Sequence, residues 1–140
     1  MDIIPLGKRP TRRANPNWFT GRVWQTPVCT AAEPGRTRAT QVSFEPGSRT
    51  AWHSHPLGQI LLIQFGVGLI GHRNSHSHLV RAGDSVWIPS GEEHWQGATL
   101  GSQLDVLEIL EAESGYVTTW MEHVSDEEYA VEYKPQTPLS

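Results

Sequence analysis

The sequence predicts an all-β fold, built as one small barrel or sandwich of short strands. A chain of 140 residues amounts to about one domain, because single cores usually take roughly 100–200 residues. Its 13 glycines and 10 prolines are scattered along the chain, which is typical of a fold with many turns. Alternating or β-branched runs recur at short intervals from residue 17 onward, whereas no stretch has the helical periodicity of an all-α bundle.

The expected strands follow one another through the middle of the chain. Residues 39–44 alternate between two faces, which indicates a half-buried strand. Residues 60–65 form a β-branched and aromatic run, which also favours a strand. The polar residues 73–75 predict a hairpin tip between strands at 67–72 and 78–80. Further strands are expected at 85–88, 104–110 and 116–120.

The two ends of the chain differ from this middle part. Three prolines within residues 1–16 discourage regular structure, so we expect a flexible N-terminal arm there. The barrel is expected to span residues 17–124. Ser125 followed by Glu128 predicts a capping box that opens a helix over 126–133. Residues 125–140 are therefore expected to form a short C-terminal helix and a tail.

Composition excludes several classes of partner. The net charge of −4, from 11 basic and 15 acidic side chains, argues against a nucleic-acid binder. The longest apolar run, residues 60–63, is too short to cross a membrane. No apolar core follows the basic residues near the N-terminus, so no signal peptide is expected. The single cysteine, Cys29, excludes an internal disulfide and fits a reducing compartment, and we expect a cytoplasmic protein.

Charge is divided unevenly along the chain. Residues 1–50 carry eight basic and three acidic side chains, and residues 51–140 carry three basic and twelve acidic ones. This asymmetry fits either a solvated N-terminus or a basic arm that docks on an acidic body, including that of a second subunit. A barrel of this size also has little spare surface to hide an apolar outer sheet. We therefore expect a homodimer, with the N-terminal segment as the part that could cross to the partner.

Three histidines and one glutamine form a possible metal-binding set. His53 and His55 are two residues apart, so on a strand both point to the same face. Gln59 follows at an even offset, and His94 comes after a second turn. Three imidazoles and one amide oxygen would make an open-sided site for a divalent first-row metal. Taken alone, the His53–His55 pair fits a structural role equally well.

The spacing around these residues resembles the two cupin motifs. Residues that match the first motif are Gly47, His53, His55, Gln59 and Gly66. Residues that match the second are Gly83, Pro89, Gly91 and His94. The resemblance implies a small jelly-roll cupin β-barrel, with metal ligands at His53, His55, Gln59 and His94. Two positions depart from the usual pattern, because Gln59 replaces a glutamate and Ala98 an asparagine.

A narrower resemblance covers most of the chain. Residues 17–21, 42–47, 50–59 and 120–124 are similar to the bacterial manganese-dependent cupin hydroxynitrile (mandelonitrile) lyases. The resemblance implies cyanohydrin cleavage and synthesis, with Mn(II) as the ion and Fe(II), Zn(II) or Ni(II) as alternatives. It also implies a substrate pocket that includes Val42, Thr50, Gln96, Val106 and Leu110. Val106 and Gln96 stand where those lyases carry pocket histidines, so the expected base is missing from its usual place.

A neutral glutamine ligand changes the charge of the metal centre. A glutamate ligand would leave a divalent site with one net positive charge, whereas Gln59 leaves two. The less compensated metal is the stronger Lewis acid toward an alkoxide, carbonyl or nitrile. It is also harder to oxidise, which favours lyase or isomerase chemistry over oxygen activation.

Glu108 is the candidate catalytic residue. It shares one face of the expected strand 104–110 with Leu104, Val106 and Leu110. If that face points into the barrel, burial raises the pKa of this carboxyl and makes it a candidate general base. In the reversed register, Glu108 faces water.

Two other groups of side chains are expected to be structural. The histidines near the hairpin tip are assigned to the surface: His72, His76 and His78. Three tryptophans are assigned to packing in the barrel: Trp52, Trp87 and Trp95.

Three functional hypotheses follow for a small-molecule substrate. The first is a metal-dependent carbon–carbon lyase of the hydroxynitrile lyase type, acting on a small oxygenated carbon substrate. The second is a non-haem metal-dependent dioxygenase, which oxygen consumption would reveal. The third is a non-catalytic cupin that binds a small molecule without turning it over.

Overall fold

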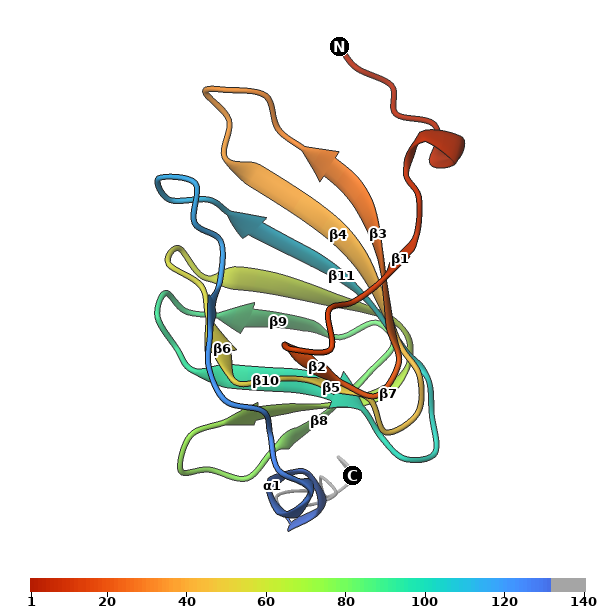
Figure 1. Cartoon of the computed structure of the whole chain (residues 1–140), viewed down its shortest axis with the longest axis vertical. Helices are drawn as coiled ribbons and strands as arrows, with labels where there is room; N and C mark the ends of the chain where they lie inside the picture. Colours follow the sequence, from red (N-terminus) through yellow and green to blue (C-terminus); the bar gives the residue numbers. More distant parts are fainter. Residues whose placement is uncertain (132–140) are drawn as a thin grey trace.

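The computed structural model describes residues 1–131 and shows an all-β barrel with one short C-terminal helix (Figure 1). Its elements are, in chain order, η1 Leu6–Lys8, β1 Arg12–Arg13, β2 Phe19–Thr20, β3 Val23–Thr30, β4 Thr37–Phe44, β5 Arg49–Thr50, β6 His53–Ser54, β7 Gln59–His72, β8 His78–Arg81, β9 Ser85–Ile88, β10 His94–Ala98, β11 Leu104–Glu111, β12 Thr119–Trp120 and α1 Asp126–Val131. The predicted fold class is therefore confirmed.

All strand pairs are antiparallel, and the sheet curls around one interior. The order along its main path is β1-β3-β4-β11-β7-β10-β5-β2. Strands β8 and β9 pair with β7, and β6 joins β10 to β12. Figure 1 shows the long strands as the curved wall of the barrel, with α1 below it near the C-terminal end.

Strand β7 links the two halves of the sheet. Its first half pairs with β11 and β9, and its second half pairs with β8 and β10. The sequence predicted two strands here, 60–65 and 67–72, and the structure joins them into one strand of 14 residues. Gly66 lies at the junction with a φ of +83°, and a Cβ there would collide with the Gln103 carbonyl. A bend at a glycine lets one strand serve both halves of the barrel.

Two strands of the wall lie where the sequence analysis predicted none. Strand β3 is rich in threonine and carries Pro27, near which its register with β4 shifts. Cys29 lies in this strand and is exposed. Strand β10 is fully buried although it contains His94, Gln96 and a glycine. Neither sequence alternates apolar and polar residues, so periodicity gave no signal for them.

The ends of the chain are more regular than expected. Residues 1–16, predicted as a flexible arm, contain β1, which pairs with β3 of the same chain. Ala14 is buried beside it. At the other end, the predicted capping box is confirmed, because Ser125 and Glu128 exchange side-chain to backbone hydrogen bonds of 3.0 Å. The helix runs from Asp126 to Val131, and the rest of the predicted 126–133 helix and the tail lies outside the described residues.

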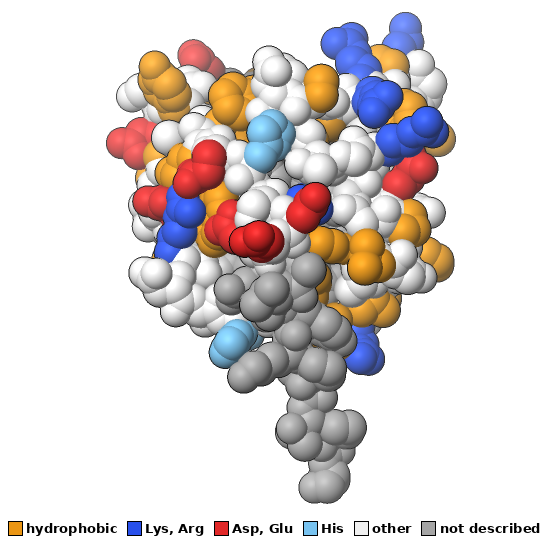
Figure 2. Space-filling model, turned by 60° about the horizontal axis from the view of Figure 1, so that its bottom comes forward, with side chains coloured by type: hydrophobic (Ala, Val, Ile, Leu, Met, Phe, Trp, Pro, Cys, Tyr) orange, Lys and Arg blue, Asp and Glu red, His pale blue; other side chains and the backbone are white. Residues whose placement is uncertain are grey.

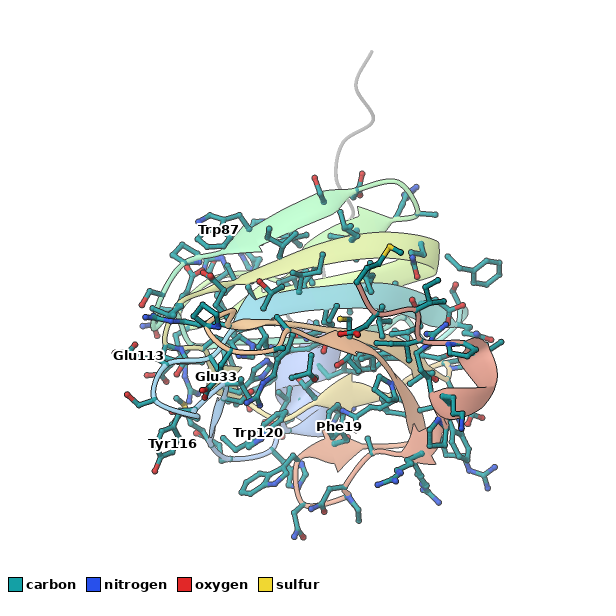
Figure 3. All side chains as sticks on the ribbon, turned by 90° about the horizontal axis from the view of Figure 1, so that it is seen from above. Phe19, Glu33, Trp87, Glu113, Tyr116 and Trp120 are labelled. Carbon is teal, nitrogen blue, oxygen red and sulfur yellow. The ribbon has the colours of Figure 1, made fainter. Side chains whose placement is uncertain are left out.

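Two apolar clusters hold the barrel together. The larger fills its closed end and includes Val42, Phe44, Leu61, Leu104 and Val106. The smaller packs under α1, and its members are Trp52, Leu69, Leu79, Trp95, Val124 and Tyr129. The prediction that Trp87 packs in the barrel is wrong. Its side chain is 60% exposed and points outward from β9 (Figure 3).

The surface near α1 is acidic, since the first turn of the helix carries Asp126, Glu127 and Glu128. Figure 2 shows acidic side chains at the centre of this face, and Lys and Arg side chains at its upper right. Among the described residues, no helix is long and apolar enough to span a bilayer.

Candidate metal centre

Three histidine rings converge inside the barrel. His53 lies in β6, His94 opens β10 opposite it, and His55 follows in the next turn. Each Nδ1 lies close to one backbone carbonyl oxygen. The distances are 2.9 Å to Ala51, 2.7 Å to Val117 and 3.0 Å to Glu92, in the order His53, His55, His94. A carbonyl only accepts hydrogen bonds, so each Nδ1 donates and each Nε2 keeps its lone pair.

The three rings are positioned as a chelating group. Their candidate ligand atoms all lie within 4.8 Å of one another, and the three residues are buried. Burial lowers the pKa of His53 well below its ordinary value of 6.5, and the nearby His94 and His55 rings lower that pKa further. Burial also lowers the pKa of His94 to about 4 and lowers the pKa of His55. Neutral imidazoles at pH 7 are the form that binds a metal.

Gln59 completes the predicted donor set. It begins β7, is buried, and lines the same cavity as the three histidines. Within the described part of the chain, its Oε1 has no hydrogen-bond partner, nor has Nε2 of His55 or of His94. Buried acceptors without partners are costly. A divalent cation satisfies all of them at once, so these residues fit the metal that the sequence predicted.

The cavity beside the histidines has a volume of about 230 Å³. It is lined by Phe19, Gln25, Arg38, Thr40, Thr50, His53, His55, Gln59, Gln96, Glu108, Leu110, Val117, Thr118 and Trp120. Three of the predicted pocket residues are in this lining: Thr50, Gln96 and Leu110. The other two, Val42 and Val106, are register partners on β4 and β11 and lie in the apolar cluster. They support the cavity from behind and are not among its lining residues.

Glu108 lies on the inward face of β11. Its carboxylate lines the cavity and accepts a 2.7 Å hydrogen bond from Nε2 of Gln96. The structure therefore decides between the two registers that the sequence left open. Burial raises the pKa of Glu108 to about 7, although the hydrogen bond from Gln96 opposes that shift. A carboxyl group with this pKa can exchange protons near neutral pH.

Sequence reasoning missed several lining residues. Trp120 closes one side of the site, with its ring centroid 4.9 Å from that of His53. Trp18 stacks on the outside of Trp120 at 5.6 Å. Figure 3 shows Trp120 and Phe19 together on this side of the barrel. Arg38 and Thr40 line the wall from β4. Their alternation with Val42 was a usable signal, because residues two apart on a strand share one face.

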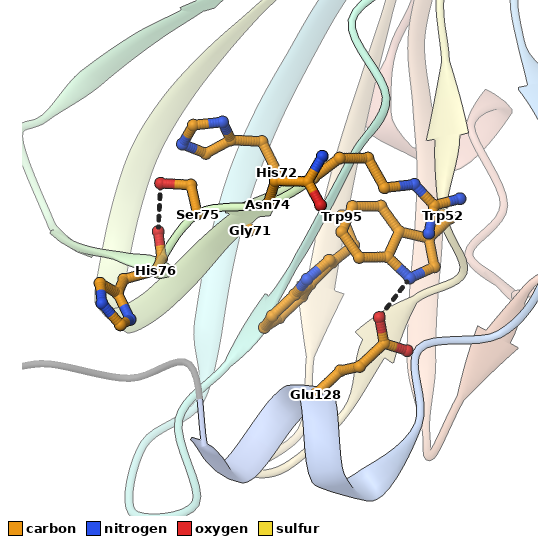
Figure 4. A pocket seen from close by; sticks show the side chains of 9 residues that line it. Trp52, Gly71, His72, Asn74, Ser75, His76, Trp95 and Glu128 are labelled. Atoms are coloured by element: carbon orange, nitrogen blue, oxygen red, sulfur yellow. Dashed lines mark hydrogen bonds between the residues drawn. The ribbon is translucent and has the colours of Figure 1, made fainter.

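Of the larger hollows outside the barrel interior, two contain histidine side chains. One, of about 570 Å³, is bounded by Trp52, Arg73 and Glu128 near α1 (Figure 4). Three of its polar side chains are already engaged, since Trp52 donates to Glu128 and Arg73 pairs with Glu93 and Glu122. The other, of about 490 Å³, contains His72 and His78, whose Nε2 atoms are 3.1 Å apart. Neither hollow contains the full histidine group.

The comparisons with known proteins agree with this geometry. The sequence profile of the cupin domain matches residues 40–110. A Granulicella tundricola protein named (R)-mandelonitrile lyase is 40% identical over 129 residues, which are 92% of this chain and 98% of that protein. The chain belongs to the cupins. The matched region includes every predicted metal ligand and Glu108 of this cupin.

Solved structures support the same fold. A cupin-like protein from Thermotoga maritima has a TM-score of 0.83 and 34% identity to this cupin, covering 89% of this chain and 94% of that chain. A polyketide cyclase from Streptomyces resistomycificus has a TM-score of 0.71 at 16% identity, covering 92% of this chain and 90% of that chain. The second likeness shows the shared barrel alone.

Proposed function

We propose that this cupin is a divalent-metal-dependent carbon–carbon lyase that acts on a small oxygenated carbon substrate, in the manner of the hydroxynitrile lyases. The observation that carries the proposal is the placement of the Glu108 carboxyl in the same cavity as the three converging histidines. The 40% identity to a protein named (R)-mandelonitrile lyase supports this class of chemistry.

The proposed metal ligands are His53, His55, Gln59 and His94. We propose Mn(II) as the ion, because an amide oxygen adds a hard donor to three imidazoles, and this donor set also accepts Fe(II), Zn(II) or Ni(II). When bound, the ion supplies a Lewis acid that polarises a substrate oxygen. The backbone carbonyls at Ala51, Val117 and Glu92 fix the ring orientations before any ion arrives. The exposed thiol of Cys29 fits a reducing compartment, and we propose a cytoplasmic location.

Glu108 is proposed as the base. Its raised pKa leaves a carboxylate that accepts a proton from a substrate hydroxyl near neutral pH. Gln96 holds that carboxylate by donating to Oε1. The backbone N–H of Gln96 in turn donates to Thr50 Oγ1 at 3.1 Å. Two fixed hydrogen bonds therefore orient the proton acceptor, with no histidine required at position 106.

A single series of assays tests this function. Metal content is measured in the purified protein, and mandelonitrile cleavage is then compared at matched metal loading. Glu108→Gln should retain the metal and lose roughly 10²–10⁴-fold in cleavage rate, the usual contribution of a placed base. Substrate-dependent oxygen consumption without cleavage would instead indicate a dioxygenase. Binding without turnover of any cyanohydrin would indicate a non-catalytic cupin.

A further inference from the structure

We propose that the cavity selects a small carboxylate that also carries a hydroxyl or oxo group, and that Arg38 binds its carboxylate. This inference rests on the proposed function, because the hydroxyl or oxo group is assigned to the metal end of the cavity. It adds a substrate class and a specificity-determining residue to a site whose proposed reaction otherwise takes neutral cyanohydrins.

Arg38 lies on the same cross-strand row as the proposed metal ligand Gln59. Leu110 of β11 is the register partner of Arg38 on β4 and of Gln59 on β7. All three residues line the cavity. Neighbouring strands are about 4.8 Å apart, so the Cα atoms of Arg38 and Gln59 are separated by roughly 10 Å. A bound molecule can therefore reach from one to the other while its apolar part contacts Leu110.

Among the described residues, the Arg38 guanidinium is not engaged by another side chain. Throughout residues 1–131, it forms no ion pair and no side-chain hydrogen bond. It also borders a shallow outer hollow that contains Glu33, Arg36 and Ser114, which places it at the mouth of the barrel. Figure 3 shows Glu33, Glu113 and Tyr116 at this end of the molecule. A half-buried guanidinium with five unused donors is a ready site for a carboxylate, which it binds through two parallel hydrogen bonds.

The charge balance of the cavity also favours an anion. Among the described residues that line the cavity, Glu108 is the single acidic one and Arg38 the single permanently cationic one. The proposed metal ligands are all neutral, so a bound divalent ion keeps both of its charges. The cavity with its ion therefore carries an excess of positive charge, which attracts an anionic substrate and is partly neutralised by it.

The lining offers hydrogen-bonding groups to such a molecule at both ends of the cavity. At the metal end, Oε1 of Gln96 is a buried acceptor without a partner among the described residues, and it can accept a bond from the substrate hydroxyl. At the mouth, Thr40 lies two residues from Arg38 on the same face of β4 and also lines the cavity, so its hydroxyl can donate to the carboxylate. The volume of about 230 Å³ limits the substrate to a small acid.

Binding to the metal-loaded protein tests the proposal. Isothermal titration calorimetry compares mandelate with the neutral mandelamide, which has the same shape without the charge. We expect mandelate to bind wild type at least tenfold more tightly, because hydrogen bonds to charged groups usually contribute that much or more. Arg38→Gln should sharply reduce this preference, leaving only the part due to the charge of the ion, while its metal content and mandelamide affinity stay at the wild-type level. Arg38→Lys should retain part of it, because lysine keeps the charge and loses the planar fork.

Arg36→Gln is the matched control, because Arg36 borders the outer hollow and not the cavity. It should leave the mandelate preference unchanged. Equal affinities for mandelate and mandelamide in wild type, or an unchanged preference in Arg38→Gln, would overturn the proposal. Cleavage of mandelonitrile without the anion preference leaves the proposed function standing and rejects the role of Arg38. Anion preference without any cleavage rejects the lyase and retains Arg38. Failure to load a metal rejects both.

Discussion

At the scale of single residues, each histidine of the site is held by a backbone carbonyl, and Nε2 of His55 and of His94 has no hydrogen-bond partner among residues 1–131. The sequence could predict the histidines because His53 and His55 come from one short segment, and His94 follows a recognisable turn. The alternation of Arg38 with Val42 indicates that both lie on one face of β4, but the row that Arg38 shares with Gln59 could not be predicted, because it depends on the register among β4, β11 and β7. Those strands lie far apart along the chain, and a shift of one residue would turn Arg38 to the outside.

The first prediction concerns the metal ligands. The double variant His53→Ala/His94→Ala should lose nearly all bound metal, because it removes two of four protein ligands. Metal content after dialysis, measured by plasma mass spectrometry, is the readout. The control is His78→Ala, which removes a histidine from the exposed pair with His72 and should keep full occupancy. A double variant that still binds one ion per chain would refute the assignment.

The second prediction is a pH profile set by Glu108. Burial raises the pKa of its carboxyl to about 7 before a metal binds, and the charge of a bound divalent ion lowers that pKa. Below this pKa the carboxyl is protonated and cannot accept a proton, so in the cleavage reaction kcat/KM should rise roughly tenfold per pH unit up to a pH at or below about 7 and then level off. At matched metal loading, kcat/KM of Glu108→Gln should not show this rise with pH. A wild-type rate that is flat from pH 5 to 8 would speak against Glu108 as the base.

The same group should also affect stability in the metal-free protein. The folded state keeps the Glu108 proton up to about pH 7, whereas the unfolded chain releases it near the ordinary value of 4.5. Within that window the folded state binds more protons, so this residue lowers the free energy of unfolding as pH rises. Wild type should therefore lose stability relative to Glu108→Gln between pH 5 and pH 8 in urea titrations. An unchanged difference would contradict the raised pKa.

At the scale of elements, the strands that periodicity predicted are the ones with one buried and one exposed face. Strand β4 fits this rule, since Val42 and Phe44 are buried while Gln41 and Ser43 are partly exposed. Strand β10 does not follow this rule. Every residue from His94 to Ala98 is buried, and its polar side chains belong to the candidate metal centre. A strand whose polar side chains point into a cavity has no polar–apolar alternation, so sequence patterns overlook it.

The fourth prediction concerns the contact between β7 and β10. A Cβ on Gly71 would lie 1.9 Å from Nε1 of Trp95, which is buried in the smaller cluster. Gly71→Ala should therefore lower the free energy of unfolding by about 1–3 kcal/mol, the usual cost of overpacking a core. Gly101→Ala is the control, because a Cβ there meets nothing within 4 Å. Equal melting temperatures for the two variants would contradict this packing.

At the scale of the whole molecule, the outer face of the sheet is unusually apolar. Trp87, Ile60 and Ile109 lie side by side on β9, β7 and β11. Trp87 and Ile60 are exposed, as are Leu62 and Phe65 on β7. A contiguous apolar area of this kind on a small protein usually marks an interface.

The fifth prediction is that a second copy of the chain covers this face. Light scattering at micromolar concentration should give twice the mass of one chain. Ile60→Lys/Trp87→Lys should give a single-chain mass, because two buried charges oppose each other across such an interface. Leu100→Lys changes an exposed leucine in the turn after β10 and should leave the dimer intact. A monomeric wild type would refute the homodimer.

The insertion of β11 between β4 and β7 has a consequence for synthesis on the ribosome. The ribosome synthesises β4, β7 and all four proposed metal ligands before it synthesises residues 104–111. Until then the nascent chain carries two open strand edges, which are templates for pairing with other chains. The late strand closes both edges and brings in Glu108 and Leu110. A translation product that stops before residue 104 would thus display the ligands without their cavity, and chaperones and proteases should remove it.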